Sequence, residues 1–253
     1  MPFVTHRGQR IHYTAAGEGP LVVLQHGLFD SAGSWARARY VAALSRRYRV
    51  VCIDSLGHGL SDKPADASLY DQAQRAGDVA AVIEALGAER AHLVGYSMGG
   101  WIAIGVAKYF PERLASLTVG GWPPVEGLDV VAAAIGRAPR FAAMLAFARA
   151  TAPQLVSWVR PEHEVGLEAC FDALGQREGA AAAVLDGRFP TLLWCGTQDV
   201  YHPPMQAFAE AHGLPLLSTP GDHLGALYAH ADEAISGLEA FLRTAEAPPS
   251  GPR

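Results

Sequence analysis

A serine between two glycines is the first residue of this sequence whose setting suggests chemistry. Ser97 stands in Gly95-Tyr96-Ser97-Met98-Gly99, between an apolar run that predicts a strand and a stretch with helical spacing. A serine on such a sharp strand-to-helix turn takes an unfavourable backbone conformation, so glycines two residues before and after it let the chain segments pass. The hydroxyl then projects at a helix N-terminus, where the Met98 amide is free to donate to a developing oxyanion. We therefore predict that Ser97 is a nucleophile and that Met98 forms half of an oxyanion hole.

A serine hydroxyl becomes an effective nucleophile only when a base accepts its proton and a third group fixes the tautomer of that base. His223 is the candidate base, because it stands after the last apolar segment and before the last predicted helix. Asp199 is the candidate acid, because it lies shortly beyond the apolar run Thr191 to Trp194. Asp222 is a rival acid, but we interpret it as a loop residue, since a sequence neighbour of the histidine points elsewhere. The predicted catalytic triad is Ser97, His223 and Asp199.

These motifs resemble the α/β-hydrolase fold family, in its esterase, haloperoxidase-like and C–C hydrolase branch, over nearly the whole chain apart from its middle. The chain order Ser97, Asp199, His223 is that of the family. The segment around His223 resembles the family's Gly-His loop, although Asp222 stands between Gly221 and the histidine. Related dehalogenases and epoxide hydrolases carry aspartate where this chain has Ser97, which argues against those two chemistries.

A second segment, His26-Gly27, resembles the oxyanion loop of the family. The resemblance implies that the backbone amide of Leu28 points at the carbonyl oxygen of the substrate. It also implies that His26 holds the loop by hydrogen bonds, because an oxyanion hole needs donors and no base. The segment Asp54 to Pro64 resembles the family's loop after the second central strand, and we assign it no chemistry. His58 within it has no partner at metal-ligand spacing, so we expect no zinc site.

Short apolar runs alternate with stretches of helical spacing, which predicts a mostly parallel central sheet with helices on both faces. A predicted hairpin of Phe3 to His6 and Arg10 to Ala15 precedes apolar runs at Leu21 to Leu24, Val50 to Ile53, His92 to Val94, Leu117 to Val119, Thr191 to Trp194 and Leu214 to Ser218. The predicted helices are Ser34 to Leu44, Tyr70 to Leu86, Gly99 to Phe110, Pro203 to His212 and Ala231 to Thr244. We expect an α/β-hydrolase core formed by residues 1–121 and 189–246.

Residues 122–188 interrupt the alternation of strands and helices. They are rich in alanine, have helical periodicity from Val130 to Ala148 and contain no convincing strand, so we predict a small helical cap inserted into the core. Four of its arginines either bind a carboxylate or form a solvated face, and we favour the second because snorkelling arginines are common. They are Arg137, Arg140, Arg149 and Arg160. The tail, 247–253, is predicted to be disordered.

Composition limits the class of partner. A formal net charge of -5 leaves no basic surplus for phosphates, so we expect no nucleic-acid partner. Three cysteines are too few for a disulfide framework and none has metal-ligand spacing, and we expect neither a metal nor an organic cofactor. The chain start lacks a basic segment followed by an apolar one, and no stretch approaches the ~20 apolar residues that span a bilayer. We expect a cytoplasmic protein with a small-molecule substrate and no membrane partner; composition leaves its oligomeric state open.

The predicted function is that of a serine hydrolase of the carboxylesterase type (EC 3.1.1), which cleaves a carboxylic ester or lactone through an acyl-enzyme. Phe29, Tyr96 and Trp122 are predicted to line the pocket. Such an apolar wall favours a small, mostly apolar substrate, because an ionic one would lose its hydration without a partner. Two alternatives stay open, since fold and triad do not fix the substrate. One is C–C bond hydrolysis or cofactor-free perhydrolysis, and the other is ligand binding with slow or no turnover.

Overall fold

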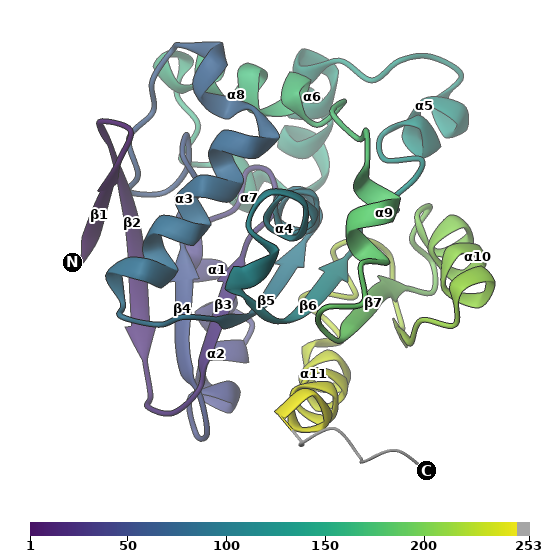
Figure 1. The fold of residues 1–253 in the computed structure, drawn as a ribbon. Coiled ribbons are helices and arrows are strands. Elements are labelled where there is room, and N and C mark those ends of the chain that lie inside the picture. The colour runs from purple at the N-terminus through teal and green to yellow at the C-terminus, as the bar shows by residue number, and fades with distance from the viewer. Residues whose placement is uncertain (247–253) are drawn as a thin grey trace.

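The computed structural model describes residues 1–246, and its centre is one mixed, mostly parallel sheet of eight strands (Figure 1). The strands lie in the order β1-β2-β4-β3-β5-β6-β7-β8. Only the pairs β1–β2 and β2–β4 are antiparallel, as expected of an N-terminal hairpin that leads into a parallel sheet. The strands are β1 (Phe3–His6), β2 (Gln9–Ala16), β3 (Leu21–Gln25), β4 (Arg49–Ile53), β5 (Ala91–Tyr96), β6 (Leu114–Gly120), β7 (Thr191–Gly196) and β8 (Leu216–Thr219). The fold is that of an α/β hydrolase. The predicted tail, 247–253, lies outside the described residues.

Both faces of the sheet are covered, which explains why its central strands are mostly apolar. Every residue of β3, β5 and β7 is buried. Successive side chains of a strand point to opposite faces. Thus Val23 packs in the cluster with Val79 and Ile102, whereas Val22 and Leu24 pack in the cluster with Trp35 and Leu238.

The core helices follow the predicted ranges, with two differences. The helices are α1 (Ala32–Arg37), α2 (Tyr40–Leu44), α3 (Gln72–Ala85), α4 (Met98–Tyr109), α10 (His202–His212) and α11 (Ala231–Glu246). The single helix predicted from Ser34 to Leu44 is two short helices, because Arg39 takes a left-handed conformation at φ +69° between them. The predicted start at Tyr70 belongs to a 3-10 turn, Ala67–Tyr70, that precedes α3.

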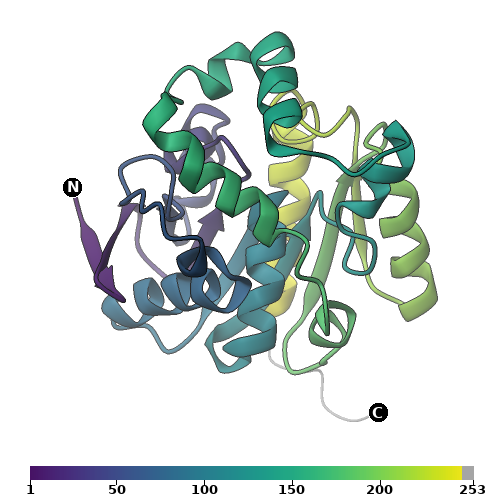
Figure 2. The same ribbon diagram turned by 90° about the horizontal axis from the view of Figure 1, so that it is seen from above.

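Five helices lie between β6 and β7 in the chain, and the part of the chain described between residues 122 and 188 contains no strand. They are α5 (Asp129–Ile135), α6 (Phe141–Thr151), α7 (Pro153–Val156), α8 (Pro161–Ala173) and α9 (Ala180–Val184). The helical periodicity predicted from Val130 to Ala148 is divided between α5 and α6, because Gly136 ends α5 at φ +71°. Figures 1 and 2 show α5, α6 and α8 above the carboxyl ends of the parallel strands. The helices therefore cover the edge of the sheet where α/β folds place their ligands.

None of the helices formed by residues 1–246 combines the length and the apolar character that a bilayer crossing requires.

Candidate active site

Ser97 occupies the turn between β5 and α4 in a strained conformation, with φ +58° and ψ -123°. The two flanking glycines make this turn possible. A Cβ at Gly95 would lie 2.0 Å from the carbonyl oxygen of Gly99, and a Cβ at Gly99 would lie 2.0 Å from that of Gln25. The Ser97 amide donates to the carbonyl of Gly120 at 2.8 Å, which fastens the turn to β6. A strained backbone conformation of this kind persists where surrounding contacts hold it in place. Here the packing at Gly95 and Gly99 and the hydrogen bond to Gly120 do so.

The structure brings Ser97, His223 and Asp199 together, each just beyond the carboxyl end of a different strand. The imidazole Nε2 of His223 lies 2.9 Å from Ser97 Oγ, and its Nδ1 lies 2.6 Å from Asp199 Oδ2. Asp199 has a side chain only 1% exposed, whereas that of His223 is 31% exposed. The second Asp199 oxygen accepts the Tyr201 amide at 3.1 Å, so this carboxylate also forms a hydrogen bond to the residue that directly precedes α10. A serine, a base and a buried acid in this order can perform nucleophilic acyl transfer.

Asp222, the rival acid, points away from the imidazole. Its Oδ1 accepts the backbone amide of Gly225 at 2.7 Å, which closes the turn that follows His223. The structure therefore agrees with the interpretation of Asp222 as a residue that stabilises its own loop.

Tyr96, predicted to line the substrate pocket, lies instead behind the histidine. Its ring is 1% exposed and packs 4.6 Å from the ring of Trp194 and 5.3 Å from that of His223. Its hydroxyl donates to the carbonyl of His223 at 2.8 Å. Burial raises the pKa of Tyr96, so the phenol stays protonated as a donor. The prediction failed because the residue before the serine still belongs to β5, whose side chains alternate between the two faces.

Gly27 brings the loop His26–Asp30 against the serine: a Cβ at Gly27 would lie 3.2 Å from Ser97 Cβ. The backbone amides of Leu28 and Met98 have no hydrogen-bond partner among residues 1–246. The amide of Phe29, in contrast, is engaged by His58 at 3.4 Å. Two free amides beside a nucleophile, one of them at the N-terminus of α4, can stabilise a negatively charged oxygen.

Two buried histidines hold this loop. The Nδ1 of His26 donates to the carbonyl of Gly27 at 2.7 Å, and its Nε2 accepts the amide of Ser55 at 3.1 Å. The His58 ring accepts from Phe29 and packs 5.2 Å from the His26 ring. Burial lowers the pKa of His26 and that of His58. Both rings are therefore neutral: His26 donates to the Gly27 carbonyl and accepts from Ser55, and His58 accepts from Phe29.

The other two residues predicted to line the pocket, Phe29 and Trp122, each pack against another aromatic ring. Phe29 is 5% exposed, has φ +67° and packs 6.1 Å from the ring of Phe141 in the cap. Trp122 is 2% exposed and packs 6.2 Å from the ring of Tyr201. Both are thus largely core residues.

Three aromatic neighbours of the site did not emerge from the sequence. Trp158 donates from Nε1 to the carbonyl of Phe29 at 2.9 Å and so connects the segment between α7 and α8 with the loop His26–Asp30. Tyr201 packs 5.5 Å from the His223 ring, and Phe141 contacts Phe29. The only sequence signal was their aromatic character, because contacts across such distances in the chain have no local pattern.

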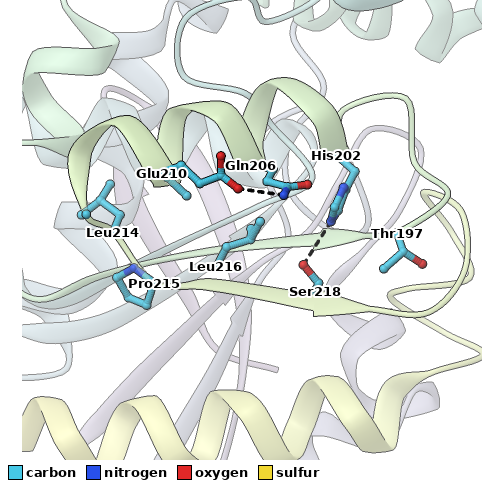
Figure 3. Close-up of a pocket in the computed structure, with 10 residues that line it drawn as sticks. Thr197, His202, Gln206, Glu210, Leu214, Pro215, Leu216 and Ser218 are labelled. Carbon is cyan, nitrogen blue, oxygen red and sulfur yellow. Dashed lines mark hydrogen bonds between the residues drawn. The ribbon is translucent and has the colours of Figure 1, made fainter.

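A hollow of the described structure lies outside this site. It has a volume of about 710 Å³ and lies between α10 and β8, where His202 Nε2 and Ser218 Oγ are 3.0 Å apart (Figure 3). None of the triad residues lines it. Across residues 1–246 no group of three or more His, Cys, Asp or Glu side chains is arranged to hold a metal ion.

Comparison with known proteins agrees with this fold. Residues 20–171 match the family model described as alpha/beta hydrolase fold. The chain belongs to the α/β-hydrolase fold family.

The most similar proteins have several activities. An epoxide hydrolase of Caballeronia sordidicola is 29% identical over 94% of this chain and 71% of its own length. A 2-hydroxymuconate semialdehyde hydrolase of a Pseudomonas species is 37% identical over 54% of this chain and 49% of its own length. The first curated relatives align with only 48% of this chain and 35% of their own length. A solved enol-lactonase from Burkholderia xenovorans LB400 has a TM-score of 0.74 at 24% identity, covers 96% of this chain and 100% of that one, and so shares the fold.

Proposed function

We propose that the protein is a serine hydrolase that cleaves a carboxylic ester or lactone of a small substrate with a mostly apolar skeleton. The observation that carries the proposal is the pair of contacts from His223, 2.9 Å to Ser97 Oγ and 2.6 Å to Asp199 Oδ2. The aromatic surroundings of the site and the free amides of Leu28 and Met98 support the same chemistry.

The proposed reaction has two halves. His223 accepts the Ser97 proton as the oxygen attacks the carbonyl carbon, and the Leu28 and Met98 amides stabilise the oxyanion. The imidazolium, held by Asp199, then protonates the leaving alcohol oxygen. In the second half His223 takes a proton from water, the hydroxide attacks the acyl carbon, and Ser97 leaves as its alcohol.

Epoxide hydrolysis does not suit a serine nucleophile. Attack by Ser97 Oγ on an epoxide carbon would leave an ether, which water does not cleave under mild conditions, whereas attack by a carboxylate leaves a hydrolysable ester. C–C bond hydrolysis is the second candidate. The likeness to a 2-hydroxymuconate semialdehyde hydrolase supports it, and the same triad and oxyanion hole would serve it.

A series of p-nitrophenyl esters from acetate to octanoate tests the proposal. Wild type is expected to hydrolyse at least one of them, and Ser97→Ala and His223→Ala are each expected to lower the rate by about 10³-fold or more. Ser157→Ala, at an exposed serine of the cap, is the matched control and should keep the wild-type rate. Folded wild type that is inert on every ester would refute ester hydrolysis and direct attention to C–C substrates or to ligand binding.

A further inference from the structure

Helix α6 of the cap presents an apolar face to solvent. Its buried residues, Phe141, Leu145 and Ala148, lie on the side that packs against the rest of the protein. At 3.6 residues per turn, the opposite side of the helix is formed by exposed apolar residues. They are Ala143, Ala146, Phe147 and Ala150. A surface helix usually places charged and polar residues on that side, so this face is suited to a contact other than water.

Two large apolar side chains are exposed on this part of the cap. Phe147 is 65% exposed, and Ile135 at the end of α5 is 52% exposed. Figure 1 shows α5, α6 and the segment 136–140 between them on the same side of the molecule, above the carboxyl ends of the parallel strands. We call the following exposed residues the cap face: Ile135, Arg137, Arg140, Ala143, Ala146, Phe147 and Ala150.

The cap face is cationic, although the chain as a whole is acidic. Residues 130–161 contain four arginines and no lysine, aspartate or glutamate, whereas the chain has a formal net charge of -5. All four arginines are exposed, as expected of a solvated face: Arg137, Arg140, Arg149 and Arg160. Arg149 binds Glu164 at 2.9 Å, but Arg137 and Arg140 form no ion pair among residues 1–246. Two arginine charges are therefore available beside the apolar residues.

We propose that the cap face docks on an anionic lipid surface. Phe147 and Ile135 enter the region between the lipid headgroups, and Arg137 and Arg140 contact the phosphates. Apolar and basic side chains on one face are the combination with which peripheral helices bind anionic membranes. Such binding needs no segment that crosses the bilayer. The inference therefore replaces the expectation of no membrane partner, which considered only a leader and spanning segments.

Lipid fits the cap face better than a second copy or an acidic protein does. A two-fold contact between copies would place Arg137 and Arg140 of both chains in one interface, where like charges repel. The outward residues of α6 have no side-chain donor or acceptor to pair with those of a protein partner. A fluid anionic lipid surface, in contrast, accepts a convex apolar helix and supplies the negative charge.

Docking through the cap face would bring the active site close to lipid. The cap helices lie above the carboxyl ends of the parallel strands, and Ser97 directly follows the end of β5 (Figure 1). An apolar ester dissolved in the lipid would thus be presented on the side of the molecule that carries Ser97. This last step rests on the proposed function, whereas the docking itself does not.

Co-sedimentation with vesicles tests the docking without turnover. The vesicles contain phosphatidylcholine alone or an equimolar mixture of phosphatidylcholine and phosphatidylglycerol. Wild type and Ser97→Ala should both bind the anionic vesicles at least about tenfold more tightly than the neutral ones, and added salt should weaken the binding. Failure of folded wild type to bind the anionic vesicles, or equal binding to both kinds, would overturn the proposal.

The apolar part of the contact is tested by Phe147→Ser. This change should lower the partition coefficient for anionic vesicles about tenfold, because it removes the largest apolar side chain of the cap face. Phe3→Ser, at a phenylalanine of β1 that is 39% exposed, is the matched control and should bind as wild type does. Unchanged binding of Phe147→Ser would exclude insertion of the cap face.

The charged part is tested by the double variant Arg137→Gln/Arg140→Gln, which should lower the partition coefficient about tenfold or more. The matched control is Arg46→Gln/Arg90→Gln, at two exposed arginines outside the cap that form no ion pair among residues 1–246. It should stay within about threefold of wild type, because charges far from the lipid are screened. Equal losses in the two double variants would contradict a defined cap face.

Further measurements distinguish the other occupants and the role in turnover. A dimer in sedimentation equilibrium that Phe147→Ser dissociates would assign the cap face to a second copy and overturn the proposal. Binding of polyglutamate without binding of anionic vesicles would assign it to an acidic protein and overturn it too. Phe147→Ser should hydrolyse a soluble p-nitrophenyl ester at the wild-type rate, and an ester carried in anionic vesicles more slowly. If no ester is hydrolysed, the proposed function fails, and the vesicle experiments still decide whether the cap face binds lipid.

Discussion

The phenol of Tyr228 donates a hydrogen bond to Oδ2 of Asp30, and this contact joins the two loops that flank Ser97. Asp30 ends the turn that carries Leu28, since its amide donates to the Gly27 carbonyl at 3.2 Å. Tyr228 lies one helical turn beyond the base, with its amide bonded to the carbonyl of Leu224 at 2.9 Å. Asp30 is only 6% exposed. The contact therefore fixes the oxyanion loop relative to the histidine loop.

Replacing Tyr228 with Phe should lower kcat about tenfold with a much smaller change in KM, because the two loops lose their connection while the apolar surroundings stay. Steady-state hydrolysis of the preferred p-nitrophenyl ester measures both constants. Tyr109→Phe, at a tyrosine that is 41% exposed at the end of α4, is the matched control. An unchanged kcat in Tyr228→Phe would show that the contact does not position the site.

The assignment of the acid is tested by a pair of isosteric changes. Asp199→Asn should lower kcat by about 10⁴-fold, because the amide favours the wrong histidine tautomer. Asp222→Asn should keep kcat within a fewfold of wild type, since the Asp222 carboxylate accepts the Gly225 amide and has no other hydrogen bond among residues 1–246. Rates of ester hydrolysis at neutral pH separate the two cases. The reverse ranking would make Asp222 the acid.

Much of this arrangement is predictable from sequence where a local pattern exists. The G-x-S-x-G turn, the alternation of strands and helices and the residues after β7 and β8 all have local signatures, and these led to Ser97, Asp199 and His223. Arg39 looks like an ordinary helical residue, yet it separates α1 from α2 in a left-handed conformation. Arg75 of α3 gave no signal of its burial, because an arginine within an amphipathic helix is normally solvated. Its burial follows from tertiary packing, which no local pattern encodes.

The steric role of the glycine after Ser97 predicts a stability effect. Gly99→Ala would place a Cβ 2.0 Å from the Gln25 carbonyl oxygen, so either β3 or the Ser97 turn must move. We expect a loss of about 3 kcal/mol or more in the free energy of unfolding, in the range of severe overpacking. Gly175→Ala, where the nearest atom would be 3.5 Å away, should stay near wild type. Urea unfolding measures both variants, and equal stabilities would contradict the packing described here.

The free energy of unfolding should decrease as the pH is lowered below about 6.5, the ordinary pKa of histidine. Burial lowers the pKa of His26 and of His58 in the folded state, so the unfolded chain takes up protons first as the pH falls. Each of these histidines then contributes a slope of up to about 1.4 kcal/mol per pH unit between 6.5 and its folded pKa. Above pH 6.5 both histidines are neutral in the folded and in the unfolded chain, so they no longer make the free energy of unfolding depend on pH.

Urea unfolding between pH 8 and 5.5 measures this slope. His58→Asn should have a shallower slope than wild type, because one of the two buried histidines is gone. The exposed His212, replaced by Gln, is the control and should leave the slope as it is. Burial raises the pKa of Asp30, which acts in the opposite direction at lower pH, so the comparison stays above pH 5.5. Parallel curves for wild type and His58→Asn would contradict a neutral, buried His58.

The central claim is that Ser97 is a nucleophile activated by His223, and covalent labelling with a p-nitrophenyl alkylphosphonate tests it most directly. Intact-mass and peptide mass spectrometry should find one phosphonyl group per wild-type chain, on the peptide that contains Ser97. Ser97→Ala should remain unlabelled, and His223→Ala should be labelled far more slowly. Absence of a label on folded wild type, or a label on another residue, would contradict the account.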